Sequence, residues 1–205
     1  MNSATSYFGK DNNQYRIVNA DPAAILKYIR DSDYKDHNLL VYPCLPQFEE
    51  FYSECCKDSI LERNDIFVVV SHYQHVSVVR KKIYLTGFNA ATYENDGSLV
   101  ILDSEIAYQP ASEQTSTYNI IILTNILKKQ VQERDKKGIT LLSDLGTFIL
   151  NNRIADLISY EQSLLATLNG NIRSFCCYHK DDFNLLQEEQ RKRILSHHLN
   201  NFIVS

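Results

Sequence analysis

The sequence predicts an α/β protein built on a doubly wound, mostly parallel sheet with helices on both faces. The expected strands, such as NLLVY at 38–42 and IFVVV at 66–70, are continuous apolar runs. Such runs are typical of strands that helices cover on both faces. Each run is followed by a stretch whose apolar residues have helical spacing. This alternation of strand and helix favours a parallel sheet.

The elements follow one another without a break that would separate two domains. Residues 1–20 are expected to form a loosely ordered lead-in, and residues 21–205 a single domain. Asp21 is placed to cap the first helix, because Pro22 suits the first helical position. The later expected strands are 98–103, 139–142, 172–178 and 201–205. The later expected helices are 46–62, 76–85, 113–137, 157–168 and 181–198.

Composition excludes several classes of protein. The formal net charge is −4 and no basic stripe is present, so no direct binding to nucleic acid is expected. No apolar run approaches the roughly 18 to 20 residues of a membrane span, and the first residues lack the apolar core of a signal peptide. We therefore expect no membrane contact.

Cysteine usage indicates the redox environment. The five cysteines are one single residue and two adjacent pairs, and neighbouring cysteines reach disulfide geometry with difficulty. The pattern predicts reduced thiols and a cytoplasmic location. The five are Cys44, Cys55, Cys56, Cys176 and Cys177.

The carboxyl ends of the strands are the first place to look for a ligand, because open parallel sheets bind ligands beyond that edge. After the first apolar strand, YPCLPQFEEF at 42–51 has no glycine and no lysine, and its prolines remove amide donors. A phosphate-binding P-loop and ATP hydrolysis by the usual route are not expected. The residues at the expected strand ends are Tyr42, Pro43, Cys44, Ser71, His72, Asp103, Ser104, Glu105, Ser143, Asp144, Tyr178 and His179.

SLVILDSE at 98–105 is similar to a Walker B strand, a hydrophobic strand that ends on an acid. Asp103 at its end either holds a metal ion or forms hydrogen bonds as a helix cap. Hydrophobic strands that end on aspartate are common, so this segment does not by itself identify a nucleotide site.

SFCCYHKDDF at 174–183 is open to three interpretations: a metal site, a thiol nucleophile or the end of a core strand. Neighbouring residues of a strand point to opposite faces, so Cys176 and Cys177 do not easily bind one ion. Cys177 and His179 share a face, but two ligands are too few for a structural zinc site. We expect no metal and no cofactor, and we expect the cysteines to pack as small apolar side chains.

A thiol nucleophile at this segment would need a stabilised thiolate. Asp181 and Asp182 begin the next expected helix, and their negative charge would raise the pKa of a nearby thiol. Tyr178 and His179 at the strand tip are expected to line a cleft instead.

Three other positions are candidates. Glu161 has an apolar flank and lies either partly buried near the cleft or on a solvated helix surface. The pair His197–His198 most simply complements the end of a helix. His37 precedes the first apolar strand and is expected to mark its entry.

Several segments, in order, resemble the MEDS domains, sensory domains named for methanogens, methylotrophs and the dichloromethane-responsive regulator. HNLLVYPCLPQFEEFYSECCKDSILERNDIFVVVSH is similar to their opening, and GSLVILDSEIAY to their central strand. YEQSLLATL and SFCCYHKDDF are similar to their Glu-bearing helix and the strand after it, and SHHLNNFIVS to their closing histidine and strand. The likeness covers about residues 37 to 204. His179 stands where the family typically has aspartate.

The resemblance implies a RecA-like three-layer α/β/α core without a P-loop, used as a small-molecule or signal sensor. It also implies a set of ligand-binding residues, to which the strand-tip histidine is added. These are His37, Tyr42, Asp103, Glu105, Tyr108, Glu161, Cys176, Tyr178 and His179.

The sequence therefore predicts a non-catalytic sensory domain that binds an unknown small molecule. A protein partner or a homo-oligomer is expected to carry its signal. Two alternatives stay open at this stage. One is a degenerate nucleotide-binding or thiol-dependent enzyme, and the other is a structural interaction subunit without a ligand.

Overall fold

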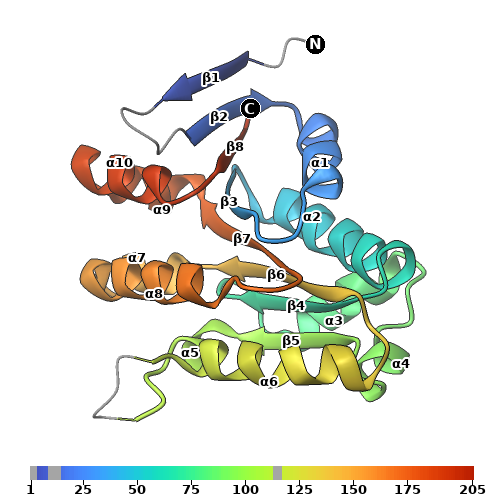
Figure 1. Ribbon diagram of the computed structural model, residues 1–205. Coiled ribbons are helices and arrows are strands. Elements are labelled where there is room, and N and C mark those ends of the chain that lie inside the picture. The colour runs from blue at the N-terminus through green and yellow to red at the C-terminus, as the bar shows by residue number, and fades with distance from the viewer. Residues whose placement is uncertain (1–3, 9–14, 113–116) are drawn as a thin grey trace.

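An eight-stranded sheet forms the centre of the protein (Figure 1). The computed structural model describes residues 4–8, 15–112 and 117–205. Across the sheet the order is β1-β2-β8-β3-β7-β6-β4-β5. All neighbouring strands are parallel except β1 and β2, which are antiparallel. The strands are β1 (Ala4–Phe8), β2 (Tyr15–Ala20), β3 (His37–Tyr42), β4 (Asp65–Ser71), β5 (Leu99–Asp103), β6 (Gly138–Asp144), β7 (Ile172–His179) and β8 (Asn200–Val204).

Helices cover both faces of this sheet, which confirms the predicted three-layer α/β architecture. The first face packs against α1 (Pro22–Asp31), α2 (Leu45–Lys57), α3 (Val76–Leu85) and α4 (Ala90–Asn95). The second packs against α5 (Ser104–Ala107), α6 (Asn119–Glu133), α7 (Gly146–Leu150), α8 (Ile154–Thr167), α9 (Lys180–Leu185) and α10 (Glu188–Ser196). A π-helical turn, η1 (Asp58–Glu62), extends α2. In the described part of the chain, no helix combines the length and apolar character that crossing a bilayer requires.

Alternation along the central strands divides the core into two layers. Leu40 and Cys177 belong to the core under α1–α3, whereas Leu39 and Cys176 belong to the core under α6–α10. Pairing of β3 with β7 sets Leu39 opposite Cys176, so side chains at matching positions share a face. The expectation that the two adjacent cysteines face opposite ways is confirmed.

Two expected elements differ in the structure. Within the expected loose lead-in, β1 and β2 are strands, and β2 pairs in parallel with β8, the last strand of the chain. The expected helix 181–198 is two helices, because Leu186 is extended (φ −67°, ψ 141°) and Gln187 begins α10 with a capping box.

Other expected boundaries agree within a few residues. The Asp21 side chain accepts a hydrogen bond of 3.0 Å from the amide of Ala24, as a helix cap does. The expected helix 113–137 is observed from Asn119 to Glu133, and residues 113–116 at its expected start lie outside the described residues.

Candidate functional site

Four side chains that are distant in sequence meet on the sheet face covered by α6–α10. His37 is the first residue of β3, Cys176 lies within β7, and Glu161 points inward from α8. His198 lies in the turn between α10 and β8. All four are at most 3% exposed. We call these four residues the buried cluster.

The polar atoms of the buried cluster are close enough to act together. One atom from each residue can be chosen so that all lie within 4.8 Å of one another. His37 Nε2 is 3.2 Å from Cys176 Sγ and 3.6 Å from Glu161 Oε2. His198 Nε2 is 3.0 Å from the same carboxylate oxygen. The two imidazole rings meet edge to face, with their centroids 4.1 Å apart.

Neighbouring groups fix the orientation of two cluster members. The Tyr178 hydroxyl donates a hydrogen bond of 2.5 Å to Glu161 Oε1, which leaves Oε2 directed at the histidines. His198 Nδ1 donates to the carbonyl oxygen of Ile194 at 2.8 Å, because a carbonyl only accepts. The other nitrogen of that ring, Nε2, is thereby turned toward Glu161.

Burial and neighbouring charge determine the protonation of the buried cluster. Burial lowers the pKa of His37 to about 3, and His198 adds to this effect, so the His37 ring is neutral near pH 7. Burial alone would raise the pKa of the Glu161 carboxyl. The two histidines and the Tyr178 hydroxyl outweigh it and lower that pKa to about 2, so Glu161 is ionised. Burial, and then the Glu161 charge, raise the pKa of the Cys176 thiol well above its ordinary value.

Three polar atoms of the buried cluster have no hydrogen-bond partner in the described structure: His37 Nδ1, Glu161 Oε2 and His198 Nε2. Glu161 Oε2 and His198 Nε2 nevertheless lie 3.0 Å apart, within ion-pair distance of each other. An unpartnered buried polar group costs about 1–3 kcal/mol. Such groups are rare in folded proteins and need an explanation. Glu161 Oε2 and His198 Nε2 face each other and His37 Nε2, and this arrangement suits a ligand that the three atoms would contact together.

Tyr42 and His179, also predicted as ligand residues, lie at the carboxyl edge of the sheet. The Tyr42 hydroxyl donates to Asp144 Oδ2 at 2.9 Å, and the rings of Tyr42 and His179 are 5.3 Å apart. At the same edge the Tyr73 hydroxyl donates to Asp182. Burial raises the pKa of Asp144 to about 7. The polar side chains at this edge therefore form a second cluster, which is separate from the buried cluster.

The remaining predicted residues have local roles. Asp103 caps α5 by accepting from the amide of Glu105 at 2.8 Å, which is the capping role considered from the sequence. Glu105 is exposed and accepts from the Thr147 hydroxyl at 2.8 Å. The Tyr108 ring is fully buried and lies 5.1 Å from the ring of Tyr160.

Of the predicted residues, the fold brings His37, Glu161, Cys176 and Tyr178 together, and it adds His198. Sequence reasoning treated His197–His198 as a helix end and missed this contact. The available signal was the position of His198 directly before the last strand. Using it requires knowing that β8 lies beside β3, which sequence periodicity does not give.

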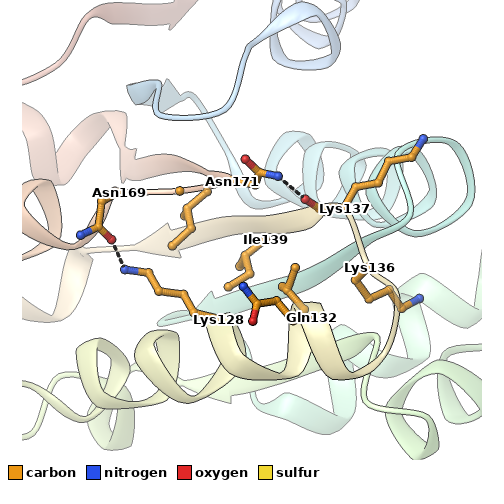
Figure 2. Close-up of a pocket in the computed structure, with 10 residues that line it drawn as sticks. Lys128, Gln132, Lys136, Lys137, Ile139, Asn169 and Asn171 are labelled. Atoms are coloured by element: carbon orange, nitrogen blue, oxygen red, sulfur yellow. Dashed lines mark hydrogen bonds between the residues drawn. The ribbon is translucent and has the colours of Figure 1, made fainter.

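A cavity of 420 Å³ opens on the other edge of the sheet, near the starts of β6 and β7 (Figure 2). Lys128 reaches across it and donates to Asn169 Oδ1 at 2.5 Å, and the Asn171 amide donates to the Lys137 carbonyl at 2.8 Å. Ile139 also lines this cavity. None of the predicted ligand residues lines this cavity.

Comparisons with known proteins agree with this fold. A KaiC-like protein from the hyperthermophilic archaeon Pyrococcus horikoshii OT3 superposes with a TM-score of 0.53 at 14% identity. The match covers 78% of this chain and 68% of that one, and it shows a shared RecA-like fold. No curated protein matches the chain. The family model for MEDS, the methanogen/methylotroph, DcmR sensory domain, matches residues 36–198. Since this match spans most of the sequence and includes all four residues of the buried cluster, the chain belongs to the MEDS family of sensory domains.

Proposed function

We propose that the chain is a non-catalytic sensory domain whose ligand binds at the buried cluster and whose signal passes to a protein partner. The observation that carries this proposal is that polar atoms of His37, Glu161, Cys176 and His198 converge in the interior, where Glu161 Oε2 and His198 Nε2 have no hydrogen-bond partner. A sequence selected for stability alone would fill the same space with apolar side chains at lower cost. Retention of these groups favours a binding role.

The placement of the buried cluster supports transmission of a signal. Its members come from β3, α8, β7 and the turn before β8, so a change in their contacts acts on four segments at once. Helix α8 carries Glu161 inward, and Leu165 on the same helix is 43% exposed. Nearby α6 also exposes Ile122 and Ile126. These apolar side chains offer a surface to a partner protein or to a second copy of the chain.

The chemistry of the cluster argues against a thiol-dependent enzyme. A nucleophilic cysteine needs a lowered pKa and access to substrate. Burial raises the pKa of the Cys176 thiol, and its side chain is fully enclosed. Binding without turnover agrees with both properties.

Native mass spectrometry of the protein purified from its own host tests the proposal. Wild type and Glu133→Gln, an exposed control on α6, should carry the same bound species, lost on denaturation. Glu161→Gln, which removes the buried charge, should carry much less of it. Hydrogen exchange of α8 peptides should then differ between filled and empty protein. A protein that is empty in every form, or whose filled and empty forms exchange identically, would contradict a sensory site here.

A further inference from the structure

The four residues of the buried cluster are of the types that bind transition metals. Two imidazoles, a thiol and a carboxylate supply the nitrogen, sulfur and oxygen donors found at zinc sites. They do not resemble the all-oxygen ligand sets of Mg²⁺ or Ca²⁺. The expectation of no metal rested on the pairs Cys176–Cys177 and Cys177–His179, whereas the fold places Cys176 in a cluster with His37 and His198.

Three of the six separations between donor atoms lie near the edge length of a tetrahedral site, and all six lie within 4.8 Å, so small side-chain movements would complete the site. Metal–ligand bonds of about 2.0–2.3 Å place neighbouring donors of a tetrahedron about 3.3–3.6 Å apart. The measured separations are 3.2 Å from His37 Nε2 to Cys176 Sγ, 3.6 Å from His37 Nε2 to Glu161 Oε2, and 3.0 Å from His198 Nε2 to Glu161 Oε2. Both atoms of the last pair face each other at ion-pair distance, as two ligand atoms of a common centre would.

The surrounding hydrogen bonds hold the donors in the orientation that a metal needs. Histidine ligands commonly donate their second ring nitrogen to a carbonyl or carboxylate. His198 does so through Nδ1 to Ile194, which presents Nε2 to the cluster. Tyr178 in the same way occupies Glu161 Oε1 and leaves Oε2 for the metal.

Charge and burial select the ion. In an interior where each ligand is at most 3% exposed, a net charge would be costly. A divalent cation bound to one thiolate, one carboxylate and two neutral imidazoles forms a neutral unit. Four protein ligands with no open position are typical of a closed, non-hydrolytic zinc site.

We infer that His37, Glu161, Cys176 and His198 bind one Zn²⁺ ion. The inference rests on the proposed function in placing the ligand at this cluster, and it names that ligand. On binding, Cys176 loses its thiol proton to solvent and the sulfur becomes a thiolate ligand. The metal then joins β3, α8, β7 and the segment before β8.

Elemental analysis after gel filtration provides the first test, on full-length protein stripped with a chelator and then given Zn²⁺ alone. Wild type should retain one zinc ion per chain, with a thermal midpoint several degrees above that of stripped protein. With Co²⁺ alone it should show the charge-transfer absorption of a cobalt–thiolate bond. Absence of both zinc retention and this absorption in wild type would overturn the inference.

The chain offers a matched control in its adjacent cysteines. Cys176→Ser should lose the cobalt–thiolate absorption and most of the zinc, whereas Cys177→Ser, equally buried on the opposite sheet face, should retain both. If Cys176→Ser fails to fold, Tyr178→Phe serves instead. This variant keeps every ligand and should weaken zinc affinity by about 10- to 100-fold. Zinc binding equal to wild type in a folded Cys176→Ser, or in Tyr178→Phe where Cys176→Ser does not fold, would contradict the assignment.

Two outcomes separate this inference from the proposed function. Wild type that carries an organic molecule at the cluster and takes up no zinc would overturn the metal site while leaving a sensory role. Zinc that binds through Cys176 without changing hydrogen exchange of α8 would support the metal site and overturn the sensory role.

Discussion

At the scale of single residues, Asp144 shows how burial sets the chemistry of the sheet edge. Its carboxyl is fully buried, accepts from the Tyr42 hydroxyl at 2.9 Å and accepts from the amide of Gly146 at 3.1 Å. Gly146 leaves no room for a side chain, since a Cβ there would lie 2.9 Å from His72 and 3.0 Å from Asp182. Burial outweighs these hydrogen bonds and raises the pKa of Asp144 from 3.8 to about 7.

This raised pKa predicts a pH dependence of stability. Between about pH 4 and 7 the folded protein holds a proton on Asp144 that the unfolded chain has lost. The contribution of this proton to stability is complete below pH 3.8 and is lost as the pH rises through 7. Asp144→Asn resembles the protonated carboxyl and removes this dependence.

Urea unfolding of both proteins across this pH range provides the measurement. The free energy of unfolding of Asp144→Asn, minus that of wild type, should increase as the pH rises. Between the unfolded and folded pKa values of Asp144, this difference should change by up to about 1.4 kcal/mol per pH unit. Parallel curves for the two proteins would show that Asp144 titrates normally.

At the scale of elements, Arg173 joins its own strand, β7, to three other segments at the amino edge of the sheet. Its Nη1 donates to the carbonyl of Ile29 at the end of α1 at 2.8 Å. Its Nη2 donates to Asp58 of η1 at 2.9 Å, and its Nε to Thr140 of β6 at 2.9 Å. The guanidinium is fully buried, so these partners replace its hydration.

Removing this guanidinium should destabilise the protein strongly. Arg173→Ala leaves Asp58 without its cation and the Ile29 carbonyl without its donor, and breaking a buried ion pair costs about 3–5 kcal/mol. Lys27→Ala, which breaks an exposed pair with Asp31 on α1, should leave the free energy of unfolding nearly unchanged. Chemical denaturation of both variants checks this, and equal effects would contradict the structural role of Arg173.

At the scale of the whole molecule, the strand order places β8, the last strand, among strands from the start of the chain. Strand β8 lies between β2 and β3, so the last strand is enclosed by two strands from the first quarter of the sequence. Figure 1 shows the C-terminus lying next to β2. The buried cluster shares this feature, since it joins residue 37 to residue 198.

The same order predicts where backbone amides are best protected. Strands β3 and β7 pair on both sides, and almost all of their residues are buried. Strand β5 is an edge strand, with alternate residues only partly buried. Amide hydrogen exchange should be slowest in β3 and β7 and faster in β5 and β1, because local opening is easiest at edges. Exchange in β5 as slow as in β7 would contradict this strand order.

The sequence by itself determined the fold class, and the family resemblance named His37, Glu161 and Cys176 as candidate site residues. Apolar runs that alternate with helical periodicity require a covered parallel sheet, because strands buried on both faces have no polar face to show. The two-residue period of a strand placed Cys176 and Cys177 on opposite faces. Prolines in place of glycines after the first apolar strand argued against a phosphate-binding loop.

Only the tertiary structure decided which distant residues meet. Periodicity shows the face to which a side chain points, but not which strands lie next to one another. His37 and Cys176 are 139 positions apart and meet because β3 pairs with β7. His198 joins them because β8 pairs with the other side of β3. Strand order depends on long-range packing of whole elements, and for that reason local sequence patterns left His198 as a helix end.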